Sequence, residues 1–129
     1  MSRAIRRFRE SHNPSWLRLM KNFPPEEYLR VLSRAACAVG NSSSFVRDAS
    51  FFGTPVVLLG DRQQGREYAQ NVMLIEGGKE SIFQAVKEQL QRGKYPPSTL
   101  YGDGRASTRI ADHLASLTPF VQKRLGYIE

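Results

Sequence analysis

The feature that most constrains the fold of this chain is an uninterrupted apolar run ending at a glycine, Thr54-Pro55-Val56-Val57-Leu58-Leu59-Gly60. A strand with one exposed face alternates apolar and polar residues, whereas a strand buried on both faces is apolar throughout. Strands of the second kind belong to parallel sheets that are covered by helices on both faces. The run therefore predicts a central strand of an α/β fold.

Strand-like and helix-like segments alternate on either side of this run. Further strands are expected at residues 16–20, 36–40 and 71–75, and helices from Pro25 onward and over residues 44–52, 80–92 and 107–117. The connection between residue 40 and the apolar run is long enough for a crossover helix. The β-α-β-α-β order therefore predicts a doubly wound parallel sheet with right-handed crossovers.

The 129 residues are expected to form one domain that is incomplete at its front end. Residues 2–11 look helical, whereas doubly wound folds normally begin with a strand that becomes central in the sheet. The chain thus reads as a fragment that lacks its first strand, with residues 118–129 as a C-terminal helical tail reaching Leu125. An uncovered apolar sheet edge favours self-association, and we expect a homo-oligomer or a partner that supplies the missing part. Sedimentation at several concentrations tests this expectation.

The composition argues against a membrane or secreted protein and indicates the charge of a possible partner. No apolar run approaches the roughly 20 residues of a membrane-spanning helix, no secretory signal is visible, and Cys37 alone forms no internal disulfide. These features predict a cytoplasmic protein without a membrane partner. The net charge of +7 suggests an anionic partner, but no nucleic-acid-binding motif is present. His12 and His113 lack partners at metal or catalytic spacing, so neither a metal centre nor a cofactor is expected.

A cluster of hydroxyl groups lies where a predicted strand ends and a helix begins, in Val39-Gly40-Asn41-Ser42-Ser43-Ser44. Ligands of open α/β sheets bind beyond the carboxyl ends of the strands, and a helix N-terminus attracts phosphate. Asp48, four residues after Ser44, offers a carboxylate for the hydroxyl groups of a sugar. The alternative is that Ser42 or Ser43 merely caps the helix, and the spacing leaves both interpretations open.

A second polar segment follows the apolar run directly, Gly60-Asp61-Arg62-Gln63-Gln64-Gly65-Arg66-Glu67. It is expected at the same edge of the sheet as the serines, and the planar guanidinium groups of Arg62 and Arg66 suit phosphate. Alternatively, this segment is a solvated loop in which Asp61 balances Arg62 and Glu67 balances Arg66. Together the two segments favour a phosphate pocket.

The motifs occur in a recognisable order: Gly40-Asn41-Ser42-Ser43, Val46-Arg47-Asp48, Phe52-Gly53-Thr54-Pro55-Val56-Val57, Gly60-Asp61-Arg62-Gln63, Gly65-Arg66 and Tyr101-Gly102-Asp103-Gly104. From about His12 to Leu117 this order resembles the C-terminal half of hydrolysing UDP-N-acetylglucosamine 2-epimerases. The resemblance implies a Rossmann-like domain, one of the two that make up a glycosyltransferase-B architecture. It also implies an enzyme family that eliminates UDP to give a 2-acetamidoglucal and then adds water or UDP.

The resemblance also implies roles for individual residues. Ser42 and Ser43 would bind phosphate, Asp48 would hold the ribose hydroxyls and Arg62 would lie near the uridine and phosphates of UDP or a UDP-amino-sugar. Further contacts are expected from Asn41, Ser44, Gln63 and Arg66. The sequence departs from the family pattern in two places: Asp48 replaces a glutamate, and Phe45 stands where small residues occur.

No catalytic residue is expected in these 129 residues, because the acid and base carboxylates of the family lie in its N-terminal domain. The isolated chain is therefore expected to show no epimerase turnover. Two alternatives stay open at this point. One is the donor-binding domain of a UDP-sugar glycosyltransferase, and the other is a non-enzymatic module whose basic N-terminal segment binds nucleic acid or protein.

Overall fold

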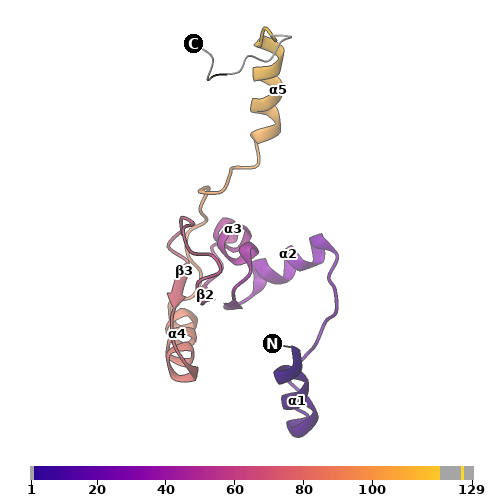
Figure 1. Cartoon of the computed structure of the whole chain (residues 1–129), viewed down its shortest axis with the longest axis vertical. Coiled ribbons are helices and arrows are strands. Elements are labelled where there is room, and N and C mark those ends of the chain that lie inside the picture. Colours follow the sequence, from indigo (N-terminus) through magenta and orange to yellow (C-terminus); the bar gives the residue numbers. More distant parts are fainter. Residues whose placement is uncertain (1, 120–125, 127–129) are drawn as a thin grey trace. The chain divides into compact units, whose positions relative to one another are not determined.

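The computed structural model describes residues 2–119 and residue 126. The chain forms two compact units, Met1–Val31 and Leu32–Glu129, which we describe separately. Figure 1 labels the elements in chain order: α1 (Ser2–His12), α2 (Pro25–Arg34), β1 (Ala38–Gly40), α3 (Ser43–Phe52), β2 (Val56–Leu59), β3 (Val72–Ile75), α4 (Lys79–Arg92) and α5 (Ala106–Ser116). In the part of the chain so described, no helix combines the length and the apolar character needed to cross a membrane.

The first unit contains α1 and a segment that the sequence predicts wrongly. Residues 16–20, expected as a strand, form a turn and irregular chain, in which the Leu17 N–H donates to the Pro14 carbonyl at 3.2 Å. A short strand is stable only when a neighbouring strand completes its hydrogen bonds, and no described strand pairs with this segment. The Trp16 side chain remains 72% exposed. The apolar pattern of residues 16–20 was therefore not enough to predict a strand, because a strand also needs a partner to pair with.

The second unit contains a three-stranded parallel sheet in the order β1-β2-β3. Gly40 is paired with Leu58, and Leu58 with Leu74, so the three strands end at one edge of the sheet. The parallel α/β architecture predicted from the sequence is thus confirmed. β2 begins two residues later than the apolar run because Pro55 has no N–H to donate, although its carbonyl still accepts from the Ala38 N–H at 2.8 Å.

Both faces of β2 are covered, as its apolar sequence predicts. Val56, Val57 and Leu58 are completely buried although successive side chains point to opposite faces of the sheet. The helices that pack on β2 are α3, which also contacts β1 and β3, and α4, which also contacts β3 (Figure 1). The strand is therefore the centre of the core.

A network of buried polar side chains joins the sheet to the helices. The Asn71 amide donates to the Thr54 carbonyl at 2.7 Å, and its oxygen accepts from the Ser50 hydroxyl at 2.9 Å. The Gln89 amide donates to the carbonyls of Val56 at 2.9 Å and Asn71 at 3.2 Å, and its oxygen accepts from the Tyr95 hydroxyl at 2.8 Å. These bonds give the buried side chains of Ser50 on α3 and Gln89 on α4 their partners and tie both helices to residues at the strands.

The helices of the second unit match their predicted positions within one residue, with α4 beginning at Lys79 and α5 covering Ala106–Ser116. Gly53 ends α3 in the left-handed conformation, and its N–H donates to the carbonyls of Ala49 and Ser50. Residues 117–119 are not helical. The remainder of the predicted helical tail lies outside the described residues.

Asp103 fixes the start of α5 and provides a pH-dependent prediction. Its carboxylate accepts from the Arg105 backbone N–H at 3.0 Å and from both terminal nitrogens of the Arg109 guanidinium at 2.8 and 3.1 Å. The hydrogen bonds from Arg109 first, and that from the Arg105 backbone second, lower the Asp103 pKa from 3.8 to about 2. Because the folded pKa is depressed, the stabilisation is complete above pH 3.8 and disappears as the pH falls toward 2.

Carboxyl NMR titration should show Asp103 with a pKa near 2 in the wild type and a pKa closer to 3.8 in Arg109→Gln. Arg105→Gln is the matched control, because it keeps the backbone N–H that Asp103 accepts from and leaves the Arg109 fork intact. An unchanged pKa in Arg109→Gln would show that the fork is not formed in solution.

Candidate functional site

The candidate site is built on the edge at which β1 and β2 end. Because Gly40 pairs with Leu58 in a parallel ladder, residues 41–44 and residues 60–67 leave the sheet at the same edge. We call these two segments the serine cap and the arginine loop. Gly40 has a φ of 150°, and a Cβ there would lie 3.2 Å from the Phe45 ring. Phe45, which departs from the family pattern, thus packs against the end of β1.

The serine cap uses one hydroxyl to start the helix. Ser42 is the N-cap of α3, and its Oγ accepts from the Ser44 N–H at 3.4 Å. The Oγ atoms of Ser42 and Ser44 are 2.9 Å apart. The capping interpretation of Ser42 is therefore confirmed. Ser42, Ser43 and Ser44 are all half-buried, so capping leaves them at the surface, where a helix N-terminus attracts anions.

The arginine loop consists of two successive turns. The Gln64 N–H donates to the Asp61 carbonyl at 2.8 Å, and the Arg66 N–H donates to the Gln63 carbonyl at 3.3 Å. The side chains of Arg62 and Arg66 are exposed. The ion pairs found within the described residues are Arg30–Glu27 and Arg109–Asp103.

The proposed charge balance between Asp61 and Arg62, and between Arg66 and Glu67, is therefore absent from the described part of the chain. Both guanidinium groups of the arginine loop keep their hydrogen-bond donors for another acceptor.

Gln63 connects the serine cap to the arginine loop, and nothing in the sequence indicated this connection. It is only 4% exposed, and its Nε2 donates to the Asn41 carbonyl at 3.0 Å. Its own carbonyl accepts from the Tyr68 hydroxyl at 2.7 Å. The sequence marks Gln63 only as a further ligand contact, because no periodicity in a polar loop indicates which side chain turns inward.

The remaining predicted site residue, Asp48, lies on α3 and is half-buried. The two ion pairs of the described residues, Arg30–Glu27 and Arg109–Asp103, do not include Asp48, Arg62 or Arg66. The structure therefore joins Asn41 to Gln63 and Ser42 to Ser44. The other candidates lie on the segments that follow β1 and β2 at the same edge of the sheet.

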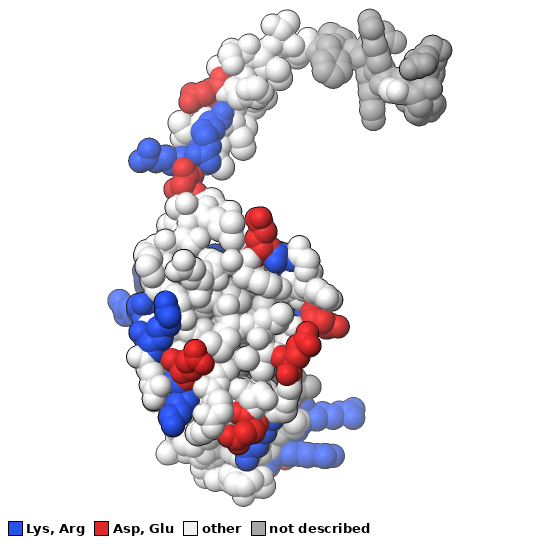
Figure 2. Space-filling view, turned by 90° about the vertical axis from the view of Figure 1, so that its left-hand side faces the viewer, with Lys and Arg blue, Asp and Glu red and all other residues white. Residues whose placement is uncertain are grey.

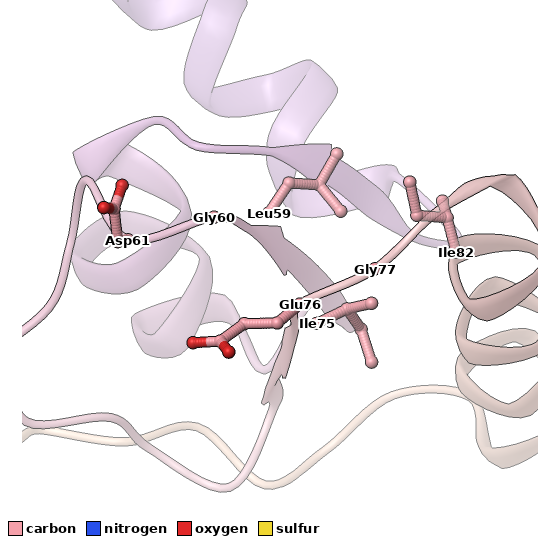
Figure 3. A pocket seen from close by; sticks show the side chains of 7 residues that line it. All are labelled: Leu59, Gly60, Asp61, Ile75, Glu76, Gly77 and Ile82. Atoms are coloured by element: carbon pink, nitrogen blue, oxygen red, sulfur yellow. The ribbon is translucent and has the colours of Figure 1, made fainter.

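A pocket of about 410 Å³ lies at the ends of β2 and β3, and no motif in the sequence indicated it. Figure 3 shows the carboxylates of Asp61 and Glu76 on one side of it and the apolar side chain of Ile82 on the other. Two carboxylates repel phosphate. The lining of this pocket is therefore unsuited to a phosphate group.

Other reactive side chains are accounted for without a ligand. Burial raises the pKa of the Cys37 thiol, which favours the thiol over the reactive thiolate. The Tyr101 hydroxyl donates to the Glu67 carbonyl at 2.5 Å and so ties the predicted Tyr101-Gly102 turn to the arginine loop. Residues 2–119 hold no group of three or more side chains arranged to ligate a metal ion.

Charged side chains of both signs are present on the surface. Figure 2 shows Lys and Arg as well as Asp and Glu on its visible face, with uncharged areas between them. Helix α1 is more strongly basic, with four arginines and one glutamate.

Comparisons with known proteins identify the family. The sequence model described as UDP-N-acetylglucosamine 2-epimerase matches residues 1–115. A UDP-N,N'-diacetylbacillosamine 2-epimerase (hydrolyzing) from Legionella pneumophila is 33% identical over 101 residues, which cover 78% of this chain and 27% of that protein. A UDP-N-acetylglucosamine 2-epimerase from Neisseria meningitidis is 32% identical over 85 residues, covering 64% of this chain and 22% of that protein.

A GDP/UDP-N,N'-diacetylbacillosamine 2-epimerase (hydrolyzing) from Campylobacter jejuni is 39% identical over 56 residues, which cover 43% of this chain and 15% of that protein. The chain thus spans about a quarter or less of the length of these curated relatives. The family match itself extends over most of the chain and includes both the serine cap and the arginine loop. The chain therefore belongs to the UDP-N-acetylglucosamine 2-epimerase family.

Proposed function

We propose that this chain binds the UDP part of a UDP-amino-sugar at the edge where β1 and β2 end. The observation that carries the proposal is the 3.0 Å hydrogen bond from Gln63 Nε2 to the Asn41 carbonyl, which holds the serine cap and the arginine loop together. The helix N-terminus and the guanidinium groups of Arg62 and Arg66, which form no ion pair within the described residues, then supply donors and positive charge for a diphosphate.

Each site residue receives a role in this proposal. Ser42 and Ser43 donate to phosphate oxygens at the start of α3, with Asn41 and Ser44 beside them. Arg62 contacts the diphosphate and the uridine, and Arg66 adds a second guanidinium. Asp48, half-buried one turn into α3, accepts from ribose hydroxyls, and its side chain is one methylene shorter than the glutamate of the family pattern.

The reaction served by this site is the elimination of UDP from the sugar nucleotide, which gives a 2-acetamidoglucal, followed by addition of water or UDP. In the elimination, a base, which the family pattern places in the N-terminal domain, takes the proton from the carbon that bears the acetamido group. The electron pair of that C–H bond forms the double bond of the glycal, the bond between the anomeric carbon and the phosphate oxygen breaks, and UDP leaves with its electron pair. Donors that bind the diphosphate more strongly as its charge develops lower the barrier to this step. The hydrolysing relatives named for diacetylbacillosamine substrates make a di-N-acetylated UDP-sugar a candidate substrate.

Titration of the full chain with UDP, followed by NMR or calorimetry, tests the proposal, with CMP and inorganic pyrophosphate as comparison ligands. Saturable UDP binding should weaken about tenfold or more in Arg62→Ala, since a charge-assisted bond is lost. Ser42→Ala should weaken it about two- to tenfold and should also lower stability by about 1 kcal/mol through loss of the cap.

Arg105→Ala is the matched control, because Arg105 is exposed and its side chain has no proposed role. If the folded wild-type chain binds neither UDP nor pyrophosphate, the site is not the one proposed. Equal weakening by Arg62→Ala and Arg105→Ala would instead indicate an effect of net charge.

The alternative functions are weakened by one observation. The family match over residues 1–115 favours an epimerase both over a glycosyltransferase donor domain and over a non-enzymatic basic module. If the chain bound nucleotides or nucleic acid with an affinity that falls steeply with salt and does not discriminate among bases, a basic nucleic-acid-binding module would become the better interpretation. The cytoplasmic location and the self-association expected from the sequence stay predictions.

A further inference from the structure

We propose that Gln63 is a positioning residue, whose buried carboxamide holds the arginine loop and the serine cap in the arrangement that binds the diphosphate. This inference rests on the proposed function, since it concerns how the same site is built. Gln63 itself does not contact the ligand in this proposal, because its side chain turns inward and is only 4% exposed. Its neighbours in the loop, Arg62 and Gln64, are both exposed.

Gln63 is held at both ends. Its main-chain carbonyl accepts from the Tyr68 hydroxyl at 2.7 Å and from the Arg66 N–H at 3.3 Å, which fixes the turn that presents both arginines. Its side-chain Nε2 donates to the Asn41 carbonyl at 3.0 Å. The positions of Arg62 and Arg66 are thereby linked to the residue that precedes the α3 cap.

The bond to Asn41 also orients the serine cap. The peptide between Asn41 and Ser42 is trans, as are all described peptides, so its C=O and N–H point in opposite directions. Because Gln63 holds the carbonyl, the Ser42 N–H faces away from Gln63, and it has no acceptor among the described residues. This N–H is therefore presented at the start of α3 in a fixed direction, which suits an anion.

The oxygen of the Gln63 carboxamide indicates that fold stability alone does not explain why a glutamine stands at this position. Gln63 Oε1 is buried and has no hydrogen-bond partner within the described residues. An unpaired buried acceptor destabilises a fold, and an apolar side chain of similar length would avoid this cost. A glutamine in this place is understandable if the amide that it directs at Asn41 serves ligand binding.

Substitution of Gln63 by methionine separates the two roles. Gln63→Met keeps the length and packing of the side chain but removes both the donor and the unpaired acceptor. In UDP titrations of the full chain we expect about two- to tenfold weaker binding, the loss typical of one hydrogen bond, with an unchanged or higher melting temperature. Gln64→Met, at the exposed neighbouring position, is the matched control and should bind UDP like the wild type.

A merely structural role for Gln63 predicts the opposite pattern, a lower melting temperature with UDP affinity lost only as far as the chain unfolds. Either that pattern or a wild-type affinity for UDP in Gln63→Met would overturn the assignment of Gln63 as a positioning residue. The proposed function would still stand in both cases if the wild-type chain binds UDP. If the wild-type chain bound neither UDP nor pyrophosphate, the proposed function would fail and this inference would fail with it.

A second variant tests the hydrogen bond by restoring it. In Gln63→Glu an ionised carboxylate faces the Asn41 carbonyl and repels it, whereas a protonated carboxyl group donates to it as the amide does. The UDP affinity of Gln63→Glu relative to wild type should therefore rise as the pH is lowered from about 8 to about 5, since burial raises a carboxyl pKa into this range. A ratio independent of pH would contradict the assignment, including in the case that Gln63→Met does not fold.

Discussion

Among substitutions of the described glycines by alanine, Gly53→Ala should cause the largest loss in free energy of unfolding. A Cβ built at Gly53 lies 1.9 Å from the Tyr95 carbonyl oxygen and 2.9 Å from the Tyr95 carbonyl carbon, both of them backbone atoms. The residue also has a φ of 63°, which non-glycine residues adopt only at a cost of about 1–2 kcal/mol. Overpacking adds about 1–3 kcal/mol, so the expected loss in free energy of unfolding is roughly 2–5 kcal/mol.

The same change would displace the chain that crosses the end of α3. The Tyr95 N–H donates to the Gly53 carbonyl at 2.9 Å, and the Ser98 N–H donates to the Ser50 carbonyl at 3.0 Å. Denaturant unfolding of Gly53→Ala and Gly60→Ala measures the effect, since Gly60 also has a positive φ, 71°, but no atom within 4 Å of the added methyl. Gly60→Ala should lose only about 1–2 kcal/mol, and equal losses would show that the close approach to Tyr95 is not formed.

Gln89→Leu is expected to have the second-largest effect, about 1–3 kcal/mol, although it places an apolar side chain in an apolar core. Gln89 is 1% exposed and forms three hydrogen bonds, two to backbone carbonyls and one from the Tyr95 hydroxyl. Its replacement leaves the Tyr95 hydroxyl buried without this partner, at about 1–3 kcal/mol, whereas the Asn71 carbonyl still accepts from the Val56 N–H at 2.8 Å.

A double-mutant cycle with Tyr95→Phe identifies the cause. In the Gln89→Leu background, Tyr95→Phe removes a hydroxyl that no longer has a partner. The double variant should therefore lose less free energy of unfolding than the sum of the two single losses, by about 1 kcal/mol or more. Gln91→Leu, on the exposed side of the same helix, should change stability by less than about 0.5 kcal/mol. Additive losses in the cycle would mean that the bond at 2.8 Å contributes little.

The fold was predictable from the sequence wherever one local pattern decided it. The apolar run through Val56, Val57 and Leu58 fixed the central strand, because only a strand covered on both faces tolerates such a run. Helices with a clear apolar face or a terminal glycine, such as α3 before Gly53, were located within one residue. Residues 16–20 were predicted wrongly because pairing with a neighbouring strand, which decides a short strand, is not a local property.

The candidate site was predictable in its parts but not in its connections. Parallel strands place their following loops at one edge, which is why Ser42 and Arg62 were expected together. The inward turn of Gln63 depends on the distance between two loops, across which its amide reaches the Asn41 carbonyl, and a single sequence does not record that distance. The acidic pocket beside Glu76 escaped notice for the same reason, since Asp61 and Glu76 lie on different loops.

The buried polar network has a consequence for the order in which the protein folds during synthesis. The amide of Gln89 reaches the Val56 carbonyl across 33 residues of sequence, and its partner Tyr95 follows later in the chain. A nascent chain therefore exposes the apolar surface of β2 until α4 has left the ribosome, and contacts between distant residues form slowly. During that interval the unpaired strand is a target for aggregation or for chaperones, a risk that the mature fold conceals.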